Sequence, residues 1–171
     1  MGEKIAFSGS HGTGKSTSVG QAFIDNKMAH PEYTIGMIME NAKDCPFDIN
    51  KGGNIYTQYW IFCNQVQREL YLQDKYDLVI CDRSVVDSIA YGSVVLGNIQ
   101  FTDSLIYLAS QYVHTYKEII FRSIKTNDYW YDDNFRQAND QKFRQDVEDE
   151  LLRIYDEIST KYDCKVNLRI T

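Results

Sequence analysis

Short apolar segments alternate along the chain with longer segments of helical character. The apolar segments predict β-strands at residues 4–8, 34–39, 77–81, 118–121 and 165–170. The intervening segments predict helices at residues 16–26, 54–71, 84–96, 103–114 and 141–161. This alternation is typical of an α/β fold with a mainly parallel sheet.

Two of the predicted helices have a clear amphipathic pattern. The apolar stripe of the helix at 54–71 consists of Ile55, Tyr59, Phe62, Val66 and Leu70. The stripe of the helix at 141–161 consists of Val147, Leu151, Ile154, Tyr155 and Ile158. The helix at 84–96 opens with Ser84-x-x-Asp87, a capping-box pattern that fixes where a helix starts.

Length and composition favour one globular domain over residues 1–171. The chain has 171 residues, 43% of them hydrophobic and 25% charged, which is enough apolar material for a packed core. No apolar segment approaches the ~18 residues that a membrane helix needs, and the first residues lack a signal-peptide pattern. The four cysteines form no C-x-x-C pair, so neither a zinc site nor a disulfide framework is predicted. We expect a reduced, cytoplasmic protein without a membrane partner.

The net charge of −6 and the pI near 5.0 disfavour a protein that binds nucleic acid through the phosphate backbone. The acidic residues are concentrated in residues 145–160, however, and the remainder of the chain is close to neutral. A local basic site elsewhere in the protein is therefore compatible with the composition.

The strongest chemical signal is Gly9-Ser10-His11-Gly12-Thr13-Gly14-Lys15-Ser16, a complete G-x-x-x-x-G-K-[ST] motif. It follows a predicted strand and precedes a predicted helix, so backbone N–H groups and the positive end of the helix dipole would face phosphate oxygens. Lys15 would neutralise the outer phosphates, and the Ser16 hydroxyl would bind Mg²⁺. We therefore predict an ATP site formed by Gly9, His11, Gly12, Thr13, Gly14, Lys15, Ser16 and Thr17.

A second signal lies where the predicted strand at 77–81 ends. Asp82 would reach the same sheet edge as the Gly-rich motif and hold the Mg²⁺ with Ser16. Arg83 brings a guanidinium that suits phosphate, although it could equally pair with Asp82 or Asp87. We interpret Asp87 as a helix cap.

Together with Ile80-Cys81-Asp82-Arg83-Ser84-x-x-Asp87-Ser88-x-Ala90-Tyr91, the Gly-rich motif resembles the P-loop nucleoside and nucleotide kinases. That family includes deoxynucleoside kinases, thymidylate kinase and phage-borne kinase-like ATPases related to ribosylnicotinamide kinase. The resemblance implies a three-layer fold with a five-stranded parallel sheet in the order 2-3-1-4-5. Two departures leave the choice between nucleoside and nucleotide open. Asn41 stands where deoxynucleoside kinases commonly have proline, and Ser84 where thymidylate kinases usually have an aromatic residue.

Glu40 is the candidate for the acceptor side of the reaction. It ends the strand predicted next to the P-loop strand, and a carboxylate there could position or deprotonate an acceptor hydroxyl. The alternative is a helix cap or a surface acid. Lys43 is interpreted either as a phosphate ligand or as a solvated lysine.

Gln58 and Gln65 lie seven residues apart on one face of the helix predicted at 54–71. An amide can pair with a base edge while a neighbouring aromatic ring stacks on the base. The resemblance places a base-reading helix here, so both glutamines are candidate substrate contacts. The aromatic residues Tyr59 and Phe62 also belong to the apolar stripe and are readily explained as core.

Residues 123–140 are polar, aromatic and without periodicity, which is more typical of a functional lid than of an ordinary loop. A lid arginine can stabilise the charge that develops in phosphoryl transfer. Arg136 is the chosen candidate, because Asp132-Asp133-Asn134-Phe135-Arg136 is similar to the lid of phage-type members. The alternative is a solvated charge run. The other basic residues of this region are Arg122, Lys125, Lys142 and Arg144.

These features predict an ATP- and Mg²⁺-dependent kinase whose acceptor is a nucleoside or a nucleoside monophosphate. Its catalytic set would be Lys15, Glu40, Asp82, Arg83 and Arg136. One alternative is a kinase of a hydroxymethylated base in phage DNA, and the other is a P-loop ATPase switch without a small acceptor. A phage-encoded protein would act in the host cytoplasm. The resemblance also suggests a homodimer through residues 103–114, although Leu105, Ile106, Tyr107 and Tyr112 could equally be core.

Overall fold

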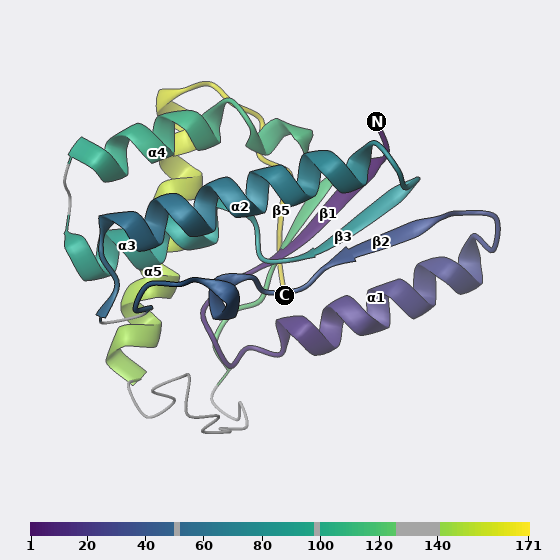
Figure 1. Cartoon of the computed structure of the whole chain (residues 1–171), viewed down its shortest axis with the longest axis horizontal. Helices are drawn as coiled ribbons and strands as arrows, with labels where there is room; N and C mark the ends of the chain where they lie inside the picture. Colours follow the sequence, from purple (N-terminus) through teal and green to yellow (C-terminus); the bar gives the residue numbers. More distant parts are fainter. Residues whose placement is uncertain (50–51, 98–99, 126–140) are drawn as a thin grey trace.

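A parallel β-sheet forms the centre of the molecule (Figure 1). The computed structural model describes residues 1–49, 52–97, 100–125 and 141–171. Its sheet has five strands in the order β2-β3-β1-β4-β5, and every pairing is parallel. The predicted architecture and strand order are thus confirmed. The strands are β1 (Glu3–Ser8), β2 (Ile35–Ile38), β3 (Leu78–Asp82), β4 (Glu118–Phe121) and β5 (Leu168–Ile170).

Helices cover both faces of the sheet and make a three-layer arrangement. Figure 1 shows α1 on one side of the sheet and α2, α3, α4 and α5 on the opposite side. The helices are α1 (Lys15–Ala29), α2 (Ile55–Gln73), α3 (Val85–Leu96), α4 (Gln100–Ser110) and α5 (Gln141–Lys161). The described residues also include the short 3-10 helices η1 (Ala42–Asp44) and η3 (Val113–Thr115).

The central strand β3 shows why a parallel sheet needs cover on both faces. All five of its residues are buried, and the four apolar ones alternate between two apolar clusters. Val79 and Cys81 join the larger cluster beneath α2 to α5, whereas Leu78 and Ile80 join the smaller cluster beneath α1. The continuous apolar sequence of this strand follows from that double burial.

Caps at the helix starts agree with the sequence signals. Ser84 and Asp87 form the predicted capping box of α3, in which the Ser84 side chain accepts from a backbone N–H and Asp87 bonds back to the Ser84 N–H. Asn54 and Thr57 form an equivalent box at the start of α2. These caps fix the residues at which both helices begin.

The helix predicted at 103–114 is placed incorrectly at both ends. The helix α4 begins earlier, at Gln100, and ends at Ser110, whose hydroxyl donates to the Tyr107 carbonyl at 2.7 Å and so competes with the helical pattern. The chain then turns through η3, which directs Tyr112 towards the core. Of the residues considered for a dimer, Leu105 and Ile106 are core, whereas Tyr107 is 53% exposed.

We expect Leu151→Ala in α5 to destabilise the protein by about 2–5 kcal/mol, because Leu151 is completely buried and its loss leaves a cavity. The neighbouring Leu152 is only partly buried, so Leu152→Ala is the matched control and should cost much less. Chemical denaturation of the three proteins measures both values. Equal losses for the two variants would contradict the assigned face of α5.

Candidate functional site

The Gly-rich motif forms a loop between the end of β1 and the first residue of α1. Gly9, Gly12 and Gly14 have φ angles of 137°, 74° and 76°, in the region that favours glycine. A Cβ at Gly9 would lie 2.5 Å from the Arg122 carbonyl oxygen, so a side chain is sterically excluded there. Glycine is thus required at these positions, and positive φ angles of this kind allow the backbone N–H groups of a loop to surround a phosphate at the start of a helix.

Lys15 is buried at the first position of α1. Its Nζ donates to the Ser10 carbonyl at 2.6 Å and to the Thr13 hydroxyl at 3.4 Å. Burial, assisted by the positive charge of Arg83, lowers the pKa of Lys15 from 10.5 to about 7. The ammonium thus lacks a full set of compensating charges, which a phosphate group at the loop would supply.

Ser16 and Asp82 meet at the edge of the sheet, as the sequence predicts. Phe7 in β1 pairs with Asp82 in β3, so both strands end at the same level. The Ser16 hydroxyl donates to Asp82 Oδ2 at 2.5 Å. A hydroxyl and a carboxylate oxygen are hard ligands, and this donor set fits Mg²⁺.

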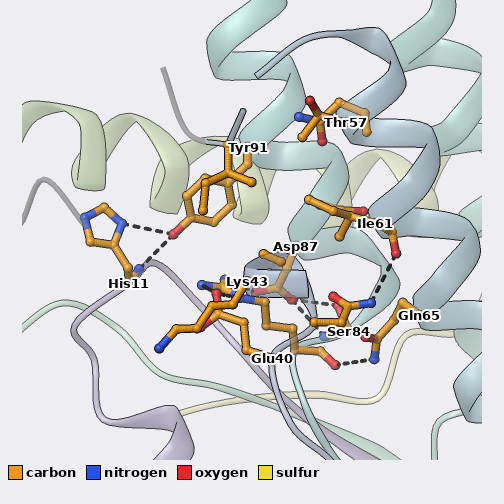
Figure 2. Close-up of a pocket in the computed structure, with 15 residues that line it drawn as sticks. His11, Glu40, Lys43, Thr57, Ile61, Gln65, Ser84, Asp87 and Tyr91 are labelled. Atoms are coloured by element: carbon orange, nitrogen blue, oxygen red, sulfur yellow. Dashed lines mark hydrogen bonds and ion pairs between the residues drawn. The ribbon is translucent and has the colours of Figure 1, made fainter. Parts of the chain in front are cut away.

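A pocket lies beside this loop, between η1, α2 and the segment that connects β3 to α3 (Figure 2). Figure 2 shows His11 and Tyr91 at one end of the pocket and Thr57, Ile61 and Gln65 on α2 at the other. The five residues predicted for the acceptor side all line it, namely Glu40, Lys43, Gln58, Gln65 and Arg83. The sequence expectation that they share one site is consistent with this arrangement.

Arg83 occupies the floor of the pocket and makes several charged contacts. Its Nε and Nη2 lie 2.9 and 2.8 Å from Glu40 Oε1. Its Nη1 lies 3.3 Å from Asp87 Oδ1 and 3.4 Å from the Gly9 carbonyl. The pairing of Arg83 with Asp87 that the sequence allowed is present, but Glu40 is a closer partner. Glu40 is therefore an internal acid of the pocket rather than a cap or a surface acid.

Asp87 does more than cap α3. It is fully buried and accepts from the Ser84 backbone and hydroxyl through Oδ2, both at 2.9 Å. Its Oδ1 accepts from the Gly9 N–H at 3.2 Å and contacts Arg83. One carboxylate thus joins the entrance of the phosphate loop to the segment after β3.

The two candidate glutamines have different environments. Gln65 Nε2 donates to Glu69 Oε1 at 2.8 Å and to the Arg83 carbonyl at 3.2 Å, so its amide hydrogens serve the protein itself. Gln58 is 4% exposed, and its Oε1 has no hydrogen-bond partner within the described residues. Gly92 makes room for it, since a Cβ there would lie 2.8 Å from Gln58 Cγ. Gln58 is therefore the better candidate for a ligand contact.

Sequence reasoning missed an aromatic cluster at the mouth of the pocket. The backbone N–H of His11 donates to the Tyr91 hydroxyl at 3.0 Å, and His11 Nδ1 lies at the same distance from it. Phe143 packs near both rings. Burial raises the pKa of Tyr91, which keeps its hydroxyl protonated. The motif Ala90-Tyr91 was the only sequence signal for this contact.

Two arginines on either side of residues 126–140 contact the phosphate loop. Arg144 in α5 is 1% exposed and donates to the His11 carbonyl at 2.9 Å. Arg122 Nε lies 3.4 Å from the Thr13 carbonyl. The lid candidate Arg136 and most of the predicted lid lie outside the described residues. The sequence identified Arg122 and Arg144 only as basic residues of this region, because their approach to the loop depends on tertiary packing.

A family model described as an AAA domain matches residues 4–165. The chain belongs to this AAA-domain family. No curated protein matches this AAA-domain chain in sequence. Within the described residues, none of its helices combines the length and apolar character needed to cross a membrane.

Solved structures of kinases share the fold of this AAA-domain chain. It is similar to deoxyadenosine kinase from M. mycoides with bound dATP, at 16% identity over 99% of this chain and 90% of that chain, with a TM-score of 0.64. It is also similar to thymidylate kinase from Candida albicans, at 18% identity over 99% and 83% of the two chains, with a TM-score of 0.66. For thymidylate kinase from Ehrlichia chaffeensis the identity is 16%, the coverages are 99% and 87%, and the TM-score is 0.58. The predicted resemblance to P-loop nucleoside and nucleotide kinases is thereby confirmed for the fold.

We expect Lys15→Met to weaken the binding of a nucleoside triphosphate by at least about tenfold, because the substitution removes the buried cation of the loop. The stability of the protein without nucleotide should not fall, because the desolvated ammonium is replaced by an apolar group. Calorimetric titration and chemical denaturation measure the two effects. Lys27→Met, at the exposed end of the same helix, is the control and should leave nucleotide affinity unchanged.

Proposed function

We propose that the protein transfers the γ-phosphoryl group of ATP, with Mg²⁺, to a hydroxyl of a nucleoside or to the phosphate of a nucleoside monophosphate. The observation that carries the proposal is the pocket that Glu40, Gln58 and Arg83 share with His11 of the phosphate loop. An acceptor in this pocket would lie beside the terminal phosphate of a nucleotide on the loop. That arrangement suits transfer between two bound substrates.

The donor side is built from the phosphate loop and α1. The backbone N–H groups of the loop and Lys15 would hold the triphosphate, while Ser16 and Asp82 would hold the Mg²⁺. When bound, Mg²⁺ neutralises charge on the phosphate oxygens. Arg144 and Arg122 contact loop carbonyls and add positive charge on the other side of the loop. Arg136 remains a proposed lid arginine.

The acceptor side is built from Glu40 and Arg83. With a nucleoside acceptor, the hydroxyl oxygen forms a bond to the γ-phosphorus, the bond to the ADP oxygen breaks, and the hydroxyl proton passes to the Glu40 carboxylate. With a nucleoside monophosphate, an ionised phosphate oxygen forms the new bond, no proton is transferred, and Glu40 only helps to position the acceptor. Arg83 fixes the position of Glu40 through two contacts to Oε1. Lys43 is proposed as a contact for a phosphate on the acceptor.

Gln58 is the proposed base contact. Its buried Oε1 accepts no hydrogen bond from the described residues, so a ligand that brings an N–H donor would satisfy it. The pocket walls around it include Ile49, Ile61 and Tyr91, which suit the faces of a planar ring. A base with an N–H group at its edge meets both requirements.

We expect Glu40→Gln to lower acceptor-dependent turnover by about 10²–10⁴-fold if Glu40 takes the proton, because the amide cannot act as a base. A role in positioning alone should lower it by about tenfold, since an amide oxygen still accepts a hydrogen bond. Binding of ATP should remain within twofold in both cases. The assay is acceptor-dependent release of ADP, and turnover within twofold of the wild type would remove Glu40 from the mechanism.

We expect the turnover of Asp82→Asn to depend on the concentration of Mg²⁺. The amide lacks the negative charge that holds the cation with Ser16, so part of the lost turnover should return at high Mg²⁺. Titration of turnover against Mg²⁺ for the variant and the wild type measures the shift. A loss of turnover that does not respond to the metal would assign Asp82 a role other than cation binding.

A further inference from the structure

A buried carboxylate lies at the centre of a hydrogen-bonded cluster beneath α2. Glu69 is 0% exposed and accepts four hydrogen bonds. Its Oε2 accepts from Lys4 Nζ at 2.6 Å and from the Tyr112 hydroxyl at 2.9 Å. Its Oε1 accepts from Gln65 Nε2 at 2.8 Å and from the Tyr116 hydroxyl at 2.7 Å. The carboxylate is thus satisfied on both sides, and Lys4 balances its charge.

The two donors on Oε1 also hold the segment between β3 and α3. Gln65 Nε2 donates a second bond to the Arg83 carbonyl at 3.2 Å (Figure 2). The Tyr116 hydroxyl accepts from the Val85 N–H at 3.1 Å. One oxygen of Glu69 is therefore connected, through two side chains, to backbone atoms on either side of Ser84. Among the described residues, the two donors to Oε2, Lys4 and Tyr112, make no bond to this segment.

This segment needs external support because of its backbone conformation. Arg83 has a φ of 101°, which non-glycine residues rarely adopt and which costs free energy. The same conformation directs the guanidinium into the pocket, where it contacts Glu40 and Asp87. Bonds to the Arg83 carbonyl and the Val85 N–H favour this conformation over relaxed alternatives.

We propose that Glu69 is a positioning residue for Arg83, acting through Gln65 and Tyr116 on the backbone of residues 83–85. Glu69 does not line the pocket and would not contact a ligand there. Its role is to determine how firmly the Arg83 guanidinium is held against Glu40. The effect on the geometry of Arg83 is independent of the reaction. The effect on turnover rests on the proposed function.

The cluster offers a matched pair of tyrosines for a direct test. Tyr112 and Tyr116 both donate to Glu69, and Lys4 Nζ lies 4.0 and 4.1 Å from the centres of their rings. Only Tyr116 also receives a bond from residues 83–85. Tyr116→Phe should therefore loosen Arg83, whereas Tyr112→Phe should not.

The readout is the exchange of the Arg83 Nε hydrogen with solvent, followed by NMR. In the wild type this hydrogen is bonded to Glu40 Oε1 at 2.9 Å. We expect exchange at least about tenfold faster in Tyr116→Phe, because local opening becomes easier. Exchange in Tyr112→Phe should stay within twofold of the wild type. Unchanged exchange in Tyr116→Phe, or equal acceleration in both variants, would overturn the proposal.

A pair of glutamines on α2 provides a second test that does not depend on Tyr116→Phe folding. Gln65 and Gln73 are both buried, and each donates to a backbone carbonyl, that of Arg83 at 3.2 Å and that of Gly2 at 3.0 Å. Gln65→Met should accelerate the exchange of the Arg83 Nε hydrogen, and Gln73→Met should not. The reverse result, or no effect of Gln65→Met, would overturn the proposal.

Turnover provides a further measurement, and it would not change if Tyr116 had only a structural role. Tyr116→Phe should lower acceptor-dependent kcat at least about tenfold while the KM for ATP stays within twofold, because the acceptor groups are misplaced. In an Arg83→Ala background Tyr116→Phe should cause no further loss, since the residue it positions is already absent. A full additional loss would overturn the proposal. A wild type that transfers phosphate to no acceptor would contradict the proposed function instead, and the exchange rates would still decide the role of Glu69.

Discussion

The register between β1 and β3 is the constraint on which the candidate site depends. Phe7 pairs with Asp82, so the two strands end together and release their following segments side by side. The phosphate loop follows β1 at this level, Asp82 ends β3, and Arg83 and Ser84 come directly after it. Asp87 then joins the two segments by accepting from Gly9 and Ser84. A shift of one residue in this pairing would turn Asp82 to the other face of the sheet and away from Ser16.

Several buried cationic side chains gather around the phosphate loop of this acidic chain. Lys15, Arg83 and Arg144 are each less than a tenth exposed, and all three lie on or beside the phosphate loop. Asp82, Asp87 and Glu40 provide the opposing carboxylates. The overall charge of −6 therefore says little about the site, because the local arrangement of cations determines which ligand is attracted.

The parts of the site that the sequence predicted are those encoded locally. The phosphate loop, the capping box at Ser84 and the position of Asp82 each depend on residues that are close in the chain, and a short motif describes them. The spacing of Gln58 and Gln65 correctly placed both on the pocket side of α2. It could not reveal that Gln65 is bound to Glu69 and Arg83, because that difference arises from contacts with other elements.

Long-range contacts account for the parts of the site that the sequence did not predict. Lys4, Glu69, Tyr112 and Tyr116 are separated by up to 112 residues in the chain, and nothing in their local sequence distinguishes them from solvated or core residues. Arg144 resembles any basic residue of an amphipathic helix until α5 packs against the phosphate loop. Sequence patterns identify the functional side chains at the strand ends. The contacts that hold these side chains in place are evident only in the folded structure.

The proposed reaction requires that the phosphate loop and the pocket of Glu40 and Arg83 serve one transfer. Incubation of the protein with γ-labelled ATP, Mg²⁺ and a panel of nucleosides, nucleoside monophosphates and DNA oligomers would follow this transfer. We expect label on a nucleoside or nucleoside monophosphate, and release of ADP that depends on that acceptor. Label found only as inorganic phosphate, at a rate that no acceptor changes, would show that the two sites do not serve one transfer.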